Sequence, residues 1–217
     1  MKIPKIGING MFTFVLLACL ATIAFKAVKA KMDERAAVRA QSVESWKELI
    51  ANRKPTLGNG KGALTIIEFS DYQCPYCKAM EPRLQQLIEK HPGSINLYRY
   101  DFPLESIHPY ARGAANAADC AAKQGVTEAY QSQLFQQRTL ESFNWAELAR
   151  KTGVPDLAAY RSCLDGDQSA DAIKRDVDAG KRLSVTGTPT FIVNGTIFRS
   201  AITADQLEAA YSNALKH

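Results

Sequence analysis

The feature that most constrains the fold is an apolar strand that runs directly into a pair of cysteines. Residues 64–69 predict the strand, and the residues after Cys74 predict a helix over 75–90. Pro75 suits the first position of this helix, because its φ is already fixed and no partner is needed for a backbone N–H. We therefore expect Cys74 at the helix N-terminus, with Cys77 one turn further along and within bonding reach.

Such a position favours the reactive form of a thiol. The unpaired N–H groups and partial positive charge of a helix N-terminus stabilise an anion. Because the thiolate is the reacting species, a lowered pKa at Cys74 would make the pair a redox centre. The spacing alone is weak evidence, since zinc sites and structural disulfides share the Cys-x-x-Cys pattern.

The charge of the chain gives no indication of nucleic-acid binding. The formal charge is +5 over 217 residues, and four of the 27 basic residues lie before residue 31, where there is no acidic one. The remaining 23 basic residues face 22 acidic ones, so residues 31–217 are almost neutral. This excludes a basic stripe for nucleic acid.

The N-terminal stretch predicts an export segment. Residues 6–25 carry no charge, and this run is long enough to span a bilayer. Val28-Lys29-Ala30 equally fits the cleavage site of a signal peptide. We expect residues 1–30 to be a signal peptide or a transmembrane anchor, and either places the rest of the chain outside the cytoplasm.

The remaining elements follow from periodicity and turn signals. Residues 33–52 predict a helix, either a spacer packed on the domain or an oligomerisation handle, and the glycines of 53–62 indicate a linker. Asn194-Gly195 is typical of a hairpin turn. The other expected elements are a strand over 95–100, helices near 109–124, 156–164 and 170–183, hairpin strands at 190–193 and 196–199, and a last helix over 203–215. Between the first two of these helices we expect one that carries Tyr130, Leu134 and Phe135 and one that starts at the capping box of residues 144–147.

Four further features accompany the cysteine pair. Glu68 stands six residues before Cys74 and Pro82 five after Cys77; residues 101–104 read Asp-Phe-Pro-Leu, with His108-Pro109 close behind, and residues 186–190 read Thr-Gly-Thr-Pro-Thr. In this order they resemble the DsbA-like branch of the thioredoxin superfamily over residues 56–217.

The resemblance implies an α/β protein with a thioredoxin fold. Residues 56–102 and 183–217 would form the thioredoxin-fold domain, and 103–182 an all-helical insertion. The membrane or signal segment, 1–30, and a short helical spacer, 31–55, would precede them.

The resemblance also implies roles for individual residues. Cys74 would be the exposed attacking sulfur and Cys77 its buried partner, while Glu68 beneath them would exchange a proton with Cys77. Thr188 and Pro189, on a cis-proline loop, would bind an extended substrate segment.

Each assignment has a plainer alternative. Glu68 could be a strand glutamate facing solvent, and Pro189 a trans turn residue. Pro75 and Tyr76 would shape the environment of Cys74, although Tyr76 could be merely a surface aromatic residue.

The implied activity is that of a thiol:disulfide oxidoreductase without a cofactor. We expect disulfide donation to reduced exported proteins, at the periplasmic face of the inner membrane or in the soluble periplasm, with a DsbB-like membrane partner for reoxidation. Pro75-Tyr76 and Thr188 also resemble periplasmic isomerases and reductases, which need an electron donor instead. The alternatives from other classes are a metal-handling module and a peptide-binding module.

Two further cysteines follow in the predicted insertion. Apart from Cys19, four cysteines allow three pairings, and the motif pair leaves Cys120 and Cys163 as a candidate structural disulfide. Two unpaired buried cysteines are the alternative. The three histidines are scattered, so we expect no zinc site at the motif.

Overall fold

The computed structural model describes residues 21–22, 25–26, 40–43 and 45–216. The chain divides into two compact units, Met1–Gln41 and Ser42–His217, and strand β1 (Ala40–Ser42) crosses their boundary. The predicted signal peptide or anchor lies largely outside the described residues. Within the described residues, no helix is both long enough and apolar enough to cross a bilayer.

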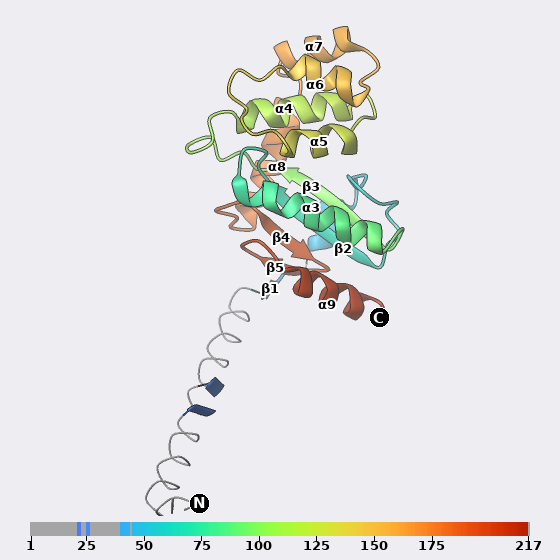
Figure 1. The fold of residues 1–217 in the computed structure, drawn as a ribbon, viewed down its shortest axis with the longest axis vertical. Helices are drawn as coiled ribbons and strands as arrows, with labels where there is room; N and C mark the ends of the chain where they lie inside the picture. Colours follow the sequence, from blue (N-terminus) through green and yellow to red (C-terminus); the bar gives the residue numbers. More distant parts are fainter. Residues whose placement is uncertain (1–20, 23–24, 27–39, 44, 217) are drawn as a thin grey trace, which may run out of the picture. The chain divides into compact units, whose positions relative to one another are not determined.

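The second unit is built on a sheet whose central strand is entirely buried. Its strands are β2 (Leu64–Ser70), β3 (Ile95–Asp101), β4 (Thr190–Val193) and β5 (Thr196–Phe198), in the spatial order β5-β4-β2-β3 (Figure 1). Strand β2 pairs with β3 in parallel and with β4 antiparallel. Because both of its faces are covered, β2 has a nearly continuous apolar sequence.

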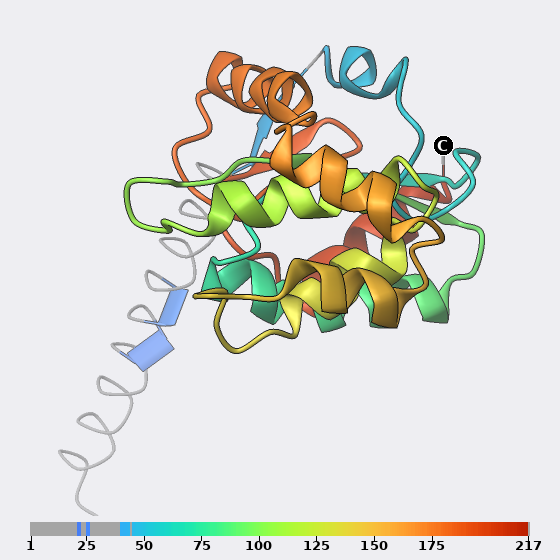
Figure 2. The same ribbon diagram turned by 90° about the horizontal axis from the view of Figure 1, so that it is seen from above.

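Helices cover both faces of this sheet (Figures 1 and 2). On one face Ile66 shares a core with Met80 of α3 and Leu207 of α9, and on the other Ile67 shares a core with Ala179 of α8. The helices of the unit are α2 (Trp46–Ile50), α3 (Pro75–Lys90), α4 (Ala111–Ala122), α5 (Glu128–Phe135), α6 (Trp145–Thr152), α7 (Leu157–Asp165), α8 (Ala170–Arg182) and α9 (Ala204–Ala214).

Helices α4 to α8 follow one another between β3 and β4, as expected for an all-helical insertion. Helices α4 to α7 form a core of their own, rich in alanine, which also takes in Cys74 and Cys77. The predicted α/β class with a thioredoxin fold is therefore confirmed. Cys74 and Cys77 lie where this helical core meets the sheet.

The expected hairpin is present. Asn194 and Gly195 both have positive φ, 43° and 90°, as a two-residue hairpin turn requires. A Cβ atom on Gly195 would lie 2.8 Å from the Trp46 ring, so the absence of a side chain there allows Trp46 to pack on the turn.

The helix expected over residues 33–52 is wrong in part. Ala40–Ser42 is a strand, and the helix is limited to Trp46–Ile50, while residues 33–39 and 44 lie outside the described part. The Val43 N–H donates to the Gly195 carbonyl at 2.7 Å, and Trp46 packs against the sheet core. These tertiary contacts outweigh the weak helical preference of the segment.

Candidate active site

Strand β2 and helix α3 place the two motif cysteines. Cys74 is the N-cap of α3, with an extended backbone (φ −67°, ψ 122°), and Pro75 occupies the first helical turn. Cys77 follows one turn later inside the helix. Both thiols are unbonded, so the structure describes the dithiol form of the pair.

The pKa of Cys74 is lowered to about 5. The largest cause is a hydrogen bond from the Cys77 thiol; Thr188 and the backbone N–H groups of Cys77 and Tyr76 also favour the anion, while burial opposes it. When Cys74 is protonated, its Sγ donates to the Thr188 carbonyl at 3.3 Å. The helix N-terminus thus acts on Cys74 as its position in the sequence predicts.

Cys77 behaves in the opposite way. Its pKa is raised, chiefly by burial and then by its hydrogen bond with Cys74 and the negative charge of Glu68. Of the two thiols, Cys74 is therefore the one that is ionised at neutral pH.

The expected difference in exposure between the two cysteines is wrong. Cys74 is 3% exposed and Cys77 1%, because the Thr188–Pro189 loop lies over Cys74. The pair is asymmetric in electrostatics and not in accessibility.

Glu68 is buried and belongs to a charged network. It is 1% exposed, which excludes the solvent-facing alternative. Its carboxylate accepts from Arg99 Nε at 3.0 Å and from Ser70 Oγ at 3.2 Å. Arg99 also pairs with Glu81 and donates to Gln131 Oε1 at 3.1 Å. Burial raises the pKa of Glu81, so this carboxylate depends on Arg99 to remain charged.

Arg99 and Glu81 were not found by sequence reasoning, although the sequence contained a signal for each. Glu68 and Arg99 are both the fifth residue of their strand, and the parallel register pairs them directly. Glu81 lies four residues after Cys77, on the same face of α3.

A second group missed from the sequence centres on Asp71, whose side chain is fully buried. One carboxylate oxygen accepts from the backbone N–H of Gln73 at 2.7 Å and of Cys74 at 3.2 Å. The other accepts from the Leu104 N–H at 2.9 Å and lies 2.8 Å from His108 Nδ1. Asp71 therefore joins the loop that carries Cys74 to the loop that follows β3.

The Thr188–Pro189 loop faces the cysteine pair. The peptide bond between these residues is cis, which excludes the trans alternative for Pro189. Pro189 is buried, whereas Pro75 and Tyr76 are exposed, Tyr76 to 67%.

The other two cysteines lie within the insertion. Cys120 of α4 and Cys163 of α7 form a disulfide, with their Cα atoms 5.8 Å apart. Both are buried, at 1% and 5% exposure. The structure therefore has the bonded pair and not the two unpaired thiols.

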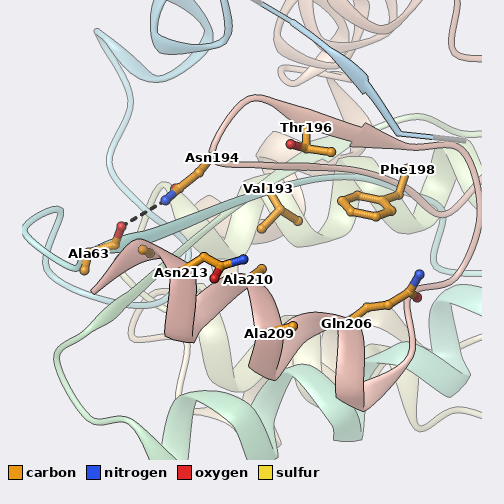
Figure 3. A pocket seen from close by; sticks show the side chains of 10 residues that line it. Ala63, Val193, Asn194, Thr196, Phe198, Gln206, Ala209, Ala210 and Asn213 are labelled. Carbon is orange, nitrogen blue, oxygen red and sulfur yellow. Dashed lines mark hydrogen bonds between the residues drawn. The ribbon is translucent and has the colours of Figure 1, made fainter. Parts of the chain in front are cut away.

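A cavity of about 520 Å³ lies elsewhere, between the β4–β5 hairpin and α9 (Figure 3). None of the residues lining it is titratable, and Asn194 at its edge is held by a hydrogen bond to the Ala63 carbonyl. It offers no redox or acid–base chemistry. Over the residues described, no three potential His, Cys, Asp or Glu ligands gather as a metal site.

Comparison with known proteins agrees with this geometry. A family profile described as thioredoxin matches residues 50–212. The Na⁺/H⁺ antiporter NhaA 3 of Salinispora tropica is 34% identical over 164 residues, which are 75% of this chain and 25% of that protein. The chain thus spans about a quarter of the length of this antiporter and of the Na⁺/H⁺ antiporter NhaA 1 of Salinispora arenicola.

Two further relatives match over most of their length. The probable disulfide bond formation protein D of Bacillus anthracis is 23% identical over 227 residues and covers 99% of this chain and 97% of that protein. A thioredoxin-like oxidoreductase from Silicibacter pomeroyi, a crystal structure, has a TM-score of 0.66 at 27% identity, covering 76% of this chain and 95% of that one. The chain belongs to the thioredoxin family.

Proposed function

We propose that this chain is a thiol:disulfide oxidoreductase that donates disulfides to exported proteins through Cys74 and Cys77. The observation that carries the proposal is the opposite pKa shift of the two thiols, down to about 5 at Cys74 and up at Cys77. Stabilising the Cys74 sulfur as an anion favours the dithiol form of the pair, so the disulfide form is a strong oxidant.

The exchange takes place in two displacements. A substrate thiolate attacks Cys74 Sγ of the oxidised pair, the Cys74–Cys77 bond breaks, and Cys77 leaves and takes up a proton because of its raised pKa. A second substrate thiolate then attacks the substrate sulfur of the mixed disulfide and expels Cys74 as a thiolate. Two electrons pass from the substrate to the pair, and the substrate gains one disulfide.

Glu68 and Arg99 would support this step from below the pair. The negative charge of Glu68 raises the pKa of Cys77. Arg99 is bonded to Glu68 at 3.0 Å and holds it as a buried carboxylate. We assign to Glu68 the proton exchange with Cys77, and to Thr188 and Pro189 the binding of an extended substrate segment.

The names of relatives support the class and the location of the substrates. Several curated relatives are disulfide bond formation proteins, and one structure of the same fold is a periplasmic thioredoxin-like protein from Salmonella enterica serovar Typhimurium. We place this chain in the periplasm, anchored to the inner membrane or free, with a DsbB-like partner for reoxidation. If it works as an isomerase or reductase, which Thr188 and Pro75-Tyr76 favour, the partner is an electron donor.

The two non-enzymatic alternatives lack comparable support. A metal-handling module would use the cysteines as soft ligands, but no third ligand joins them among the described residues. A peptide-binding module would have no need for opposite pKa shifts in its two thiols. Neither alternative explains the electrostatics of the pair.

A single-turnover experiment tests the proposal. The oxidised full chain is mixed with a reduced peptide that contains two cysteines, and peptide disulfide is quantified. We expect about one disulfide per chain, and none from Cys74→Ser. A wild-type protein that forms no peptide disulfide overturns the proposal.

Equilibration with glutathione determines the direction of electron flow. A reduction potential near that of DsbA, about −120 mV, supports disulfide donation. A potential near that of thioredoxin, about −270 mV, overturns donation in favour of a reductase.

A further inference from the structure

The segment that follows α2 lies along the free edge of the sheet. Strand β3 is the last strand on its side of the described sheet, and its partner β2 lies on the other side. Residues 53–57 run beside this edge, where the Thr56 N–H donates to the Leu97 carbonyl at 2.7 Å and the Leu97 N–H donates to the Leu57 carbonyl at 2.9 Å. We call residues 53–57 the edge strap. It pairs backbone groups that an edge strand otherwise leaves open.

The edge strap holds both backbone groups of Arg99. The Arg99 N–H donates to Thr56 Oγ1 at 3.1 Å, and the Arg99 carbonyl accepts from Arg53 Nη1 at 3.0 Å. No further strand of the described sheet lies on this side of β3, so the strap takes the place of one. Its two hydrogen bonds fix the backbone at Arg99, and with it the direction in which the side chain leaves the strand.

Helix α8 holds Arg53 in its turn. The Arg53 guanidinium forms an ion pair with Asp176 and lies 3.9 Å from the centre of the Tyr100 ring. The other carboxylate oxygen of Asp176 accepts from the Asp101 N–H at 3.0 Å, so one carboxylate joins α8 to both the strap and β3. The side chain of Asp176 is only 6% exposed. The position of Arg53 is therefore set by three elements and not by the strap alone.

The side chain of Arg99 carries the effect of the strap to the cysteine pair. Its guanidinium pairs with Glu68 at 3.0 Å and with Glu81, and both carboxylates are buried. Two negative charges thus share one positive charge. Glu68 acts on Cys77, because its charge raises the pKa of that thiol. A displaced Arg99 would leave more negative charge beneath the pair, which disfavours a thiolate there.

We propose that Arg53 and Thr56 are positioning residues for the exchange reaction, and that the edge strap sets the reduction potential of Cys74 and Cys77 by holding Arg99 in place. This inference rests on the proposed function and adds to its mechanism residues that act through Arg99. Neither of them needs to touch the substrate.

The direction of the effect follows from the redox couple. Reduction of the disulfide consumes two electrons and one proton, and at neutral pH it leaves Cys74 as the thiolate and Cys77 as the thiol. A loosely held Arg99 neutralises the buried carboxylates less well, so the Cys74 thiolate is less stable. The dithiol is then a poorer product, and the disulfide a weaker oxidant.

Replacement of Thr56 tests the proposal with little change in shape. Valine is close in size to threonine but has no oxygen that can accept from the Arg99 N–H. We expect Thr56→Val in the full chain to lower the equilibrium constant for oxidising glutathione about threefold, which corresponds to a reduction potential about 14 mV more negative. Thr56→Ser keeps the hydroxyl and is expected to restore the wild-type potential.

Thr152→Val is the matched control, because it removes a hydroxyl that donates to the Leu148 carbonyl at 2.9 Å in α6. It is expected to keep the wild-type potential. A potential that is unchanged or less negative in Thr56→Val, or that shifts equally in Thr56→Ser or in Thr152→Val, overturns this inference alone. A wild-type chain that exchanges no disulfide with glutathione overturns the proposed function with it.

Arg53 variants test the other hydrogen bond of the strap. Arg53→Met removes the donor to the Arg99 carbonyl and leaves Asp176 without its ion-pair partner. We expect the equilibrium constant with glutathione to fall threefold or more, in the same direction as for Thr56→Val. Urea unfolding of the same variant measures its stability. A loss of stability with an unchanged potential would give Arg53 a structural role only and overturn its place in the proposal.

Discussion

The two cysteine pairs of this protein use the same chemistry in opposite ways. Cys74 and Cys77 lie one turn apart at the start of α3 and are thiols, whereas Cys120 and Cys163 are 43 residues apart on different helices and form a disulfide. A bond between neighbouring turns of one helix constrains few chain conformations. A bond across 43 residues constrains many, so it stabilises the fold.

The surroundings of the two pairs differ as well. Cys74 faces backbone N–H groups and a neighbouring thiol, which favour its anion. Cys120 and Cys163 lie in the alanine-rich core of the insertion, against Ser169 and Lys123, and Lys123 itself is bonded to the Gln168 carbonyl at 2.8 Å. The comparison teaches that a neighbouring thiol and a helix N-terminus together lower the pKa of Cys74, whereas a long sequence separation makes the Cys120–Cys163 disulfide stabilise the fold.

The largest difference between the two cysteine pairs is expected when Cys74 is replaced. We expect Cys74→Ser to lower the rate of disulfide exchange by about 10³-fold or more, because no other described sulfur is held as an anion at a helix N-terminus. The control is Cys120→Ser/Cys163→Ser, which should exchange normally per folded molecule. Substantial exchange by Cys74→Ser would show that the insertion pair is itself redox-active.

The next largest effect is expected from removing the charge of Arg99, which pairs with Glu68 and Glu81 beneath Cys74 and Cys77. We expect Arg99→Met to destabilise the protein by about 3–5 kcal/mol in urea unfolding, because it leaves the buried carboxylates of Glu68 and Glu81 unpaired. The matched control in the insertion is Arg150→Met, whose partner Glu147 is exposed and which should cause no measurable change. Equal effects of the two variants would contradict the assigned network.

Removal of the disulfide between Cys120 and Cys163 should have the next largest effect on the free energy of unfolding. Closing a loop of 43 residues stabilises by at most about 4 kcal/mol on chain-entropy grounds. Cys120→Ala/Cys163→Ala should therefore lower the free energy of unfolding by up to this amount while the reduction potential of Cys74–Cys77 stays the same. A change in that potential would mean that the two pairs are coupled.

The smallest expected effect is on the pH dependence of alkylation. With a pKa of about 5, Cys74 is almost wholly thiolate at pH 6, whereas a free cysteine with a pKa of about 8.5 is less than about 1% thiolate. The lower nucleophilicity of a low-pKa thiolate offsets part of this gain, leaving roughly a tenfold faster reaction than free cysteine at pH 6. A profile that rises up to pH 8 would contradict the assignment of Cys74 as the anionic sulfur.

The same pKa has a consequence for stability. The folded pKa of Cys74, about 5, lies below that of an unfolded cysteine, so ionisation stabilises the folded dithiol form. This stabilisation is fully present above about pH 8.5 and is lost as the pH falls through about 5. The free energies of unfolding of the reduced and oxidised proteins, compared between pH 5 and pH 8.5, would measure this stabilisation.

Local signals were sufficient for much of the fold. Helix α3 has the bounds 75–90 predicted from the sequence and begins at Pro75, and the hairpin lies where Asn194-Gly195 predicts it. These features depend on neighbours in the sequence. The position of Cys74 at a helix N-terminus, and hence its low pKa, follows from the same local pattern.

What could not be predicted depends on contacts between distant segments. The pairing of Glu68 with Arg99 requires the strand register, and the link between Asp71 and His108 requires two loops to meet. The burial of Cys74 beneath the Thr188–Pro189 loop likewise joins residues 114 positions apart. The helix predicted over residues 33–52 was wrong in part because contacts with Gly195 determine the conformation before α2. The periodicity of the segment itself does not contain this information.

The packing of Trp46 on the hairpin turn fixes the start of the Ser42–His217 unit at one end of the sheet. Strand β4 runs antiparallel to β2, so the turn at Gly195 lies at the N-terminal end of β2, while Cys74 follows its C-terminal end. A load applied through Val43 would therefore be carried by the end of the sheet remote from the reactive sulfur. Immobilising the protein from that side would leave the end that carries Cys74 free.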